Sequence, residues 1–194
     1  MKNLTTDTGW VPVHFDENEQ EEIIQIGSSR RGVKEASGMR GEKLEASHQF
    51  GADGQVMGYA AECALAKVLG TQPQRDVSRR GNQGVHVEFP TDDLDEHSFR
   101  KHVTFNAAWV SDPTYDLRFN PNRVPEADVF MLLSGDLDDA MWIVGGVSRD
   151  SFKRQCKEMN FGHGLRLVVP QAQLTPARKI LRYFGVEDNI RDLE

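Results

Sequence analysis

The segment MGYAAECALAKVLG, residues 57–70, is the strongest helix prediction in the chain and constrains the rest of the fold. It is rich in alanine and leucine, which favour helix, and Gly70 is a typical residue at a helix end. The helix is apolar nearly all round, a pattern that indicates burial on most of its faces. We therefore expect it to cover a β-sheet formed by the neighbouring strands.

Strands and shorter helices are predicted on both sides of this segment. Apolar runs predict strands at 10–15, 84–89, 103–110, 115–119 and 165–170, and a hairpin at 127–148. Further helices are predicted at 17–31, 149–159 and 174–185. Asp16 and Glu19 match a capping box before the first of these, and Ser148 can cap the second. Residues 91–102, acidic and then basic, are predicted as loop or short helix.

This order of elements predicts a mixed α/β fold, with a central mixed β-sheet flanked by helices. The 194 residues, of which 38% are hydrophobic and 27% charged, fit a single domain over 1–194 with one core. Within it we expect a mobile loop at 32–54, rich in glycine, serine and charge, and an acidic C-terminal tail at 186–194.

The composition also limits the setting in which the protein works. No apolar run is long enough to span a membrane, and the N-terminal segment lacks the apolar core of a signal peptide. The two cysteines are not spaced as metal ligands, so we expect a reducing cytoplasm. The net charge of -7 lowers the expectation of tight, nonspecific nucleic-acid binding.

Glu62 is the residue of the buried helix that calls for an explanation. The positions three and four residues away from it are small or apolar, and a buried carboxylate is costly unless it is paired or bound to a cation. One interpretation is a metal ligand or site acid. The other is an ion pair at the helix edge with an arginine such as Arg30 or Arg31. The sequence leaves both open.

The strand GVHVEF, residues 84–89, supplies two further candidates, His86 and Glu88, on the positions that alternate with its apolar residues. Together with Glu62 and with Asp76 in the preceding loop, they could hold a hard divalent cation. Carboxylate oxygens suit Mg²⁺ or Mn²⁺. The alternative is an exposed sheet face with ordinary polar residues. Arg79 and Arg80 could contact phosphate, although a solvated basic loop is the interpretation that we favour.

Several segments resemble a family of small phage-encoded proteins of unassigned role, which is similar in turn to the PD-(D/E)XK nuclease superfamily. The matching pieces lie in the family's order and are GYAAECALAKVLG (58–70), GVHVE (84–88), DVFMLLSG (128–135), WIVG (142–145) and VPQAQLTP (169–176). The resemblance implies a nuclease-like fold in which the helix glutamate and the strand carboxylates belong to one site.

The strand departs from the signature that the resemblance implies, which is an aspartate followed by a glutamate and a lysine or arginine. In one register His86 takes the acid position and Glu88 the basic one, with Asn82 or Asp76 standing for the aspartate. In the other register Glu88 is the acid and Pro90 replaces the lysine. Loss of the lysine removes electrostatic stabilisation, and loss of an acid lowers metal affinity.

Two functions follow from the broken signature. The first is a catalytically degenerate, nuclease-like phage accessory protein that acts in the host cytoplasm by binding DNA or a host or phage protein. The second is an active Mg²⁺-dependent DNA endonuclease that uses Glu62, Asp76 and Glu88 as metal ligands, with His86 beside them. A third and weaker idea, a DNA mimic, rests on the acidic segments DDLDE and GDLDD.

Overall fold

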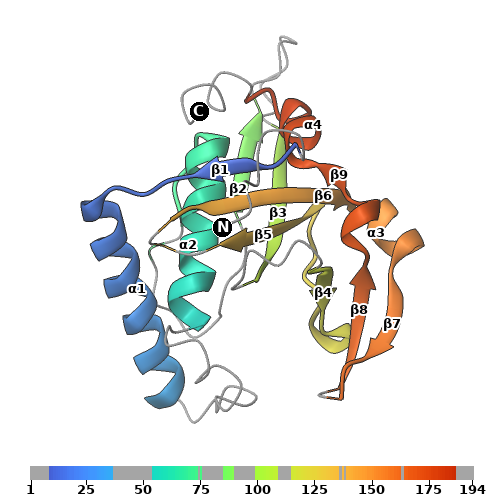
Figure 1. Ribbon diagram of the computed structural model, residues 1–194, viewed down its shortest axis with the longest axis horizontal. Helices are drawn as coiled ribbons and strands as arrows, with labels where there is room; N and C mark the ends of the chain where they lie inside the picture. The colour runs from blue at the N-terminus through green and yellow to red at the C-terminus, as the bar shows by residue number, and fades with distance from the viewer. Residues whose placement is uncertain are drawn as a thin grey trace.

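The computed structural model describes residues 9–36, 54–73, 75, 85–89, 99–108, 115–135, 137, 139–162 and 164–186. For residues 31–36, 85–89 and 99–108 other than Val103, only the backbone is described. The described residues form a mixed α/β fold, as the sequence predicts, with two sheets and a helical layer (Figure 1). No helix in these residues is long and apolar enough to cross a membrane.

The central sheet has the strand order β1-β6-β5-β3-β2, and β9 also pairs with β6. It is mixed because β3 runs parallel to β5 while the other pairs are antiparallel. The first described strand, β1, pairs with β6, a strand far along the chain, and in this pairing Val11 lies opposite Ile143. Its strands are β1 (Val11–Val13), β2 (Val85–Phe89), β3 (Phe99–Ala108), β5 (Val129–Gly135), β6 (Met141–Ser148) and β9 (Thr175–Pro176).

Helices cover one face of this sheet. The predicted buried helix is α2 (Gly54–Leu69), which packs against β2, β3 and β6 and has 11 buried residues out of 16. On its outer side lies α1 (Glu17–Ala36), and α4 (Ala177–Arg182) packs against β6 (Figure 1). The core beneath them takes alternate residues of the central strand β5, namely Val129, Met131 and Leu133.

The opposite face is covered by a smaller sheet and by one short helix. This sheet has the order β4-β8-β7 and lies to one side of the central sheet in Figure 1. A second core forms there around Phe119, Phe130 and Phe152, with Phe130 and Phe152 stacked at a ring separation of 4.3 Å. The elements on this side are β4 (Leu117–Phe119), η3 (Pro121–Arg123), α3 (Arg149–Gln155), β7 (Lys157–Asn160) and β8 (Leu165–Val169).

Local sequence signals are confirmed where hydrogen bonds within a few residues decide the structure. The capping box is formed, since the Asp16 amide donates to the Glu19 carboxylate and the Glu19 amide donates to that of Asp16, both at 2.9 Å. Ser148 caps α3 by accepting from the Ser151 amide. The hairpin predicted at 127–148 is the antiparallel pair β5–β6.

Several element boundaries differ from the prediction where distant pairing or packing overrides a local pattern. The helix predicted at 174–185 covers only Ala177–Arg182, and Thr175 and Pro176 before it pair with β6. β3 begins at Phe99, inside the segment expected to be loop or short helix, because Phe99 pairs with Phe89 of β2. The helix predicted at 149–159 ends at Gln155, because residues 157–160 pair with β8. α1, which packs along α2, continues to Ala36 and so takes up the start of the loop predicted at 32–54. The rest of that loop, 37–53, and most of the acidic tail, 187–194, lie outside the described residues.

The two long helices approach each other closely at Gly27 of α1. A Cβ atom added there would lie 2.5 Å from the Cα atom of Val56 on α2. Because that neighbour is backbone, it cannot rotate out of the way as a side chain can. Gly27 therefore sets the distance between α1 and α2.

We predict that Gly27→Ala lowers the free energy of unfolding by about 1–3 kcal/mol, the usual cost of overpacking. Helix propensity alone would act in the opposite direction, by about 1 kcal/mol. The matched control is Gly54→Ala, since a Cβ atom at Gly54 meets nothing within 4 Å. Urea unfolding of both variants provides the measurement, and stabilisation by Gly27→Ala would show that the helices are not in contact there.

Candidate functional site

Glu62 lies on the side of α2 that faces α1, and its side chain is 1% exposed. The Nη1 atom of Arg30, on α1, donates to Glu62 Oε2 at 3.1 Å. This is the ion pair that the sequence offered as one of two explanations, with Arg30 as the partner. The buried carboxylate thus has a fixed cation on the neighbouring helix.

Arg30 is held on a second side by an aromatic ring. Its guanidinium carbon lies 4.4 Å from the centre of the Tyr59 ring, and its side chain is 11% exposed. Tyr59 precedes Glu62 by three residues on α2, so both residues meet Arg30 from the same helix face. A guanidinium that is stacked and paired in this way is more fixed than a lysine ammonium would be.

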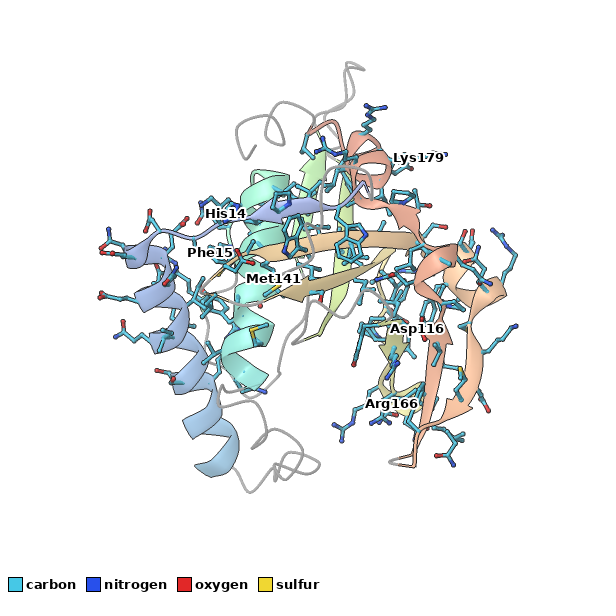
Figure 2. All side chains as sticks on the ribbon, viewed as in Figure 1. His14, Phe15, Asp116, Met141, Arg166 and Lys179 are labelled. Carbon is cyan, nitrogen blue, oxygen red and sulfur yellow. The ribbon has the colours of Figure 1, made fainter. Side chains whose placement is uncertain are left out.

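The contact between the two helices continues toward the start of α1. Lys67 Nζ donates to both carboxylate oxygens of Glu19 at 2.8 Å and to the carbonyl oxygen of His14 at 3.1 Å. His14 and Phe15 lie where β1 leads into α1 (Figure 2). Glu19 therefore serves twice, as the capping residue of α1 and as the partner of Lys67. A more exposed pair, Arg75 with Glu22 at 3.0 Å, lies nearby.

Between these ion pairs is a cavity of about 230 Å³, lined in part by Tyr59, Cys63 and Lys67 of α2. These three residues are spaced four apart and so share one helix face, which is a signal that the sequence contains. Lys67 and Arg75 each have a carboxylate partner at the cavity wall. The cavity is therefore polar but close to charge-neutral.

Burial controls the titration of both groups on the floor of this cavity. Burial raises the pKa of the Cys63 thiol to about 12, and the nearby carboxylate of Glu62 acts in the same direction. Burial also raises the pKa of Tyr59, and the adjacent Cys63 acts in the same direction. A thiol that stays protonated is a poor nucleophile, which agrees with the packing role that its place on a buried helix predicts.

The strand residues His86 and Glu88 lie in β2, as predicted, at the edge of the central sheet. In the β2–β3 register Glu88 pairs with Arg100 and Val85 with Val103. Val103 belongs to the core beneath α2, so Val85 opposite it takes a position on the face toward α2. Because residues alternate between faces along a strand, His86 and Glu88 take register positions on the face away from α2. Glu62, by contrast, lies in the helical layer.

The other predicted site residues, Asp76, Arg79 and Arg80, lie outside the described residues. The metal site of Glu62, Asp76 and Glu88, with His86 beside it, therefore stays a prediction. Within the part of the chain that the structure describes, no group of three or more histidine, cysteine, aspartate or glutamate residues could hold a metal ion. The one candidate whose side chain is described, Glu62, is paired with an arginine.

Comparison with known proteins does not assign the chain to a family. No family model, no curated protein and no solved structure matches it. The resemblance to PD-(D/E)XK nucleases stays a prediction, and the function must be argued from this chain's own residues.

We predict that Glu62→Gln lowers the free energy of unfolding by about 3–5 kcal/mol, because it leaves Arg30 buried beside a neutral amide. The matched control is Glu22→Gln, which breaks the exposed pair with Arg75 and should cost less than about 1 kcal/mol. Urea unfolding at neutral pH compares the two variants. Equal losses of unfolding free energy in the two variants would show that the Glu62 pair stabilises the fold no more than the exposed pair does.

A second prediction concerns the reactivity of Cys63. An ordinary cysteine has a pKa of about 8.5, so at pH 9 the folded chain should hold several hundredfold less Cys63 thiolate than the unfolded chain, roughly 700-fold. Alkylation by iodoacetamide, followed by mass spectrometry with and without urea, measures this difference. Because the folded pKa is raised, this group's contribution to stability is complete below about pH 8.5 and is lost as the pH rises toward 12. Equal alkylation rates in the two states would contradict the assignment.

Proposed function

We propose that this chain is a catalytically degenerate, PD-(D/E)XK nuclease-like protein that acts by binding a protein or a nucleic acid rather than by cleaving one. The observation that carries the proposal is the ion pair between Arg30 and Glu62, at 3.1 Å. In the resemblance, the helix glutamate is a residue of the active site. In this chain the same glutamate holds two helices together.

A metal ligand must offer its oxygens to a site that the cation and substrate can reach. The side chain of Glu62 is 1% exposed, and a guanidinium that is itself stacked on Tyr59 lies against one of its oxygens. A divalent cation would have to displace that guanidinium or tolerate its charge. Displacement would break an ion pair whose two side chains are 11% and 1% exposed, and breaking a buried pair costs on the order of 3–5 kcal/mol.

The strand supports the same conclusion from independent residues. The position of the expected lysine is occupied either by Glu88 or by Pro90, depending on the register. Lys101 of β3 does not replace the missing lysine. It pairs with Val87, so its register position lies on the opposite face of the sheet from that of Glu88. The cation across from Glu88 is Arg100, which stays protonated and cannot accept a proton from water.

The expected setting is the cytoplasm of a bacterial host, where a phage accessory protein would meet host proteins and DNA. The net charge of -7 favours a protein partner, since a nucleic-acid binder usually has a basic surface. Arg79 and Arg80 remain the candidates for phosphate contact if the partner is DNA.

The first test is calorimetric titration of Mg²⁺ and Mn²⁺ into the wild-type chain and into Asp76→Asn and Glu88→Gln, followed by incubation with plasmid and single-stranded DNA. We expect no saturable cation binding that depends on these carboxylates, and no cleavage. Binding that either variant abolishes, together with plasmid cleavage by the wild type, would overturn the proposal in favour of the Mg²⁺-dependent endonuclease.

The nature of the partner is tested separately, by fluorescence anisotropy of labelled duplex and single-stranded DNA over a salt series. Binding that weakens with salt and is reduced in an Arg79→Ala, Arg80→Ala double variant would identify a nucleic-acid partner. If neither DNA binds at low salt, the partner is not DNA, and the proposal then requires a protein partner.

A further inference from the structure

A second cavity, of about 410 Å³, lies on the opposite face of the central sheet from Glu62. Its walls come from α3, from the segment that follows η3 and from β8, three parts of the chain that are far apart in sequence. The volume falls in the range of small-molecule sites, which are mostly apolar with a few placed polar groups. The proposed function does not use this cavity.

The floor of the cavity is rigid and apolar. It includes Phe130 and Phe152, which stack on each other, and Phe119 packs its ring edge to face with both. Leu167 of β8 closes one side. Because these rings belong to the second core, the cavity is formed before any ligand arrives, and binding need not order them.

The rim carries two cations from one face of α3. Arg149 and Lys153 are four residues apart, so they are neighbours on the helix and repel each other. Arg149 is oriented by its Nε atom, which donates to the Ala127 carbonyl oxygen at 2.6 Å, and its Nη2 atom is 3.5 Å from Asp128 Oδ1. Lys153 is exposed and has no ion-pair partner among the described residues. An anion at this rim would pair with Lys153.

Charge complementarity then defines the ligand. Glu126 also lines the cavity and Asp128 pairs with Arg149, so Lys153 is the cation of the rim that has no ion-pair partner in the described part of the chain. We propose that the cavity between α3, β8 and the segment after η3 binds a small carboxylic acid with an apolar body, whose carboxylate meets Arg149 and Lys153 and whose body rests on Phe130 and Phe152. A single carboxylate gives Lys153 an ion-pair partner, and the apolar floor selects an aliphatic or aromatic body over a polar one.

The test uses octanoate as the probe, with octylamine and octanol, whose alkyl chains are one carbon longer, as comparison ligands. Calorimetric titration into the full chain should give saturable binding of octanoate, at least about threefold tighter than binding of the other two, the ratio that one exposed ion pair supplies. Lys153→Glu should weaken octanoate binding by at least about tenfold. The matched control is Lys157→Glu, the same charge change on exposed β7 outside the cavity, which should leave binding unchanged.

Cys156 lines the same cavity and reports whether the ligand occupies it. Saturating octanoate should slow alkylation of Cys156 by iodoacetamide in the wild type, and this protection should be lost in Lys153→Glu. Equal affinity for octanoate and octylamine, full binding by Lys153→Glu, or no octanoate binding at millimolar concentration would each overturn the proposal. The result does not depend on metal binding or DNA binding, so it stands or falls separately from the proposed function.

Discussion

The ion pair between Arg30 and Glu62 is the constraint around which the helical layer is organised. A buried carboxylate is tolerated only with a partner, and the partner must come from another helix because the neighbours of Glu62 on α2 are small or apolar. The arginine therefore fixes where α1 lies along α2, and Gly27 lets the two backbones approach closely enough for the pair to form. Such a pair adds little net stability compared with an apolar contact, but it admits few alternative arrangements of the two helices.

The central strand β5 connects this layer to the opposite side of the molecule. All of its residues are buried, because alternate positions enter the two cores, Met131 beneath the helices and Phe130 beneath the smaller sheet. The fold thus has two sides of different chemistry. On one side, ion pairs connect two long helices. On the other side, stacked aromatic rings lie below a rim that carries Arg149 and Lys153.

The predictions from sequence were confirmed where structure depends on near neighbours. The buried helix, the β5–β6 hairpin and the Asp16–Glu19 capping box each depend on patterns a few residues long. The early start of β3 and the strand β7 depend on partners far along the chain, which the local charged sequence does not reveal. For Glu62 the sequence offered an ion pair as one alternative, but the choice between Arg30 and Arg31 depends on how α1 is rotated, which only packing decides. Both cavities were missed, because their walls come from segments that no local pattern connects.

The pairing of β1 with β6 has a consequence for the order in which the protein folds. During synthesis β1 and α1 leave the ribosome well before Ile143, the partner of Val11. The β5–β6 hairpin and α3 are local and can form as soon as they emerge, but the ends of so long a loop close slowly. The N-terminal strand is therefore expected to dock late. Until it does, β6 presents an unpaired edge that a folding catalyst or chaperone could occupy.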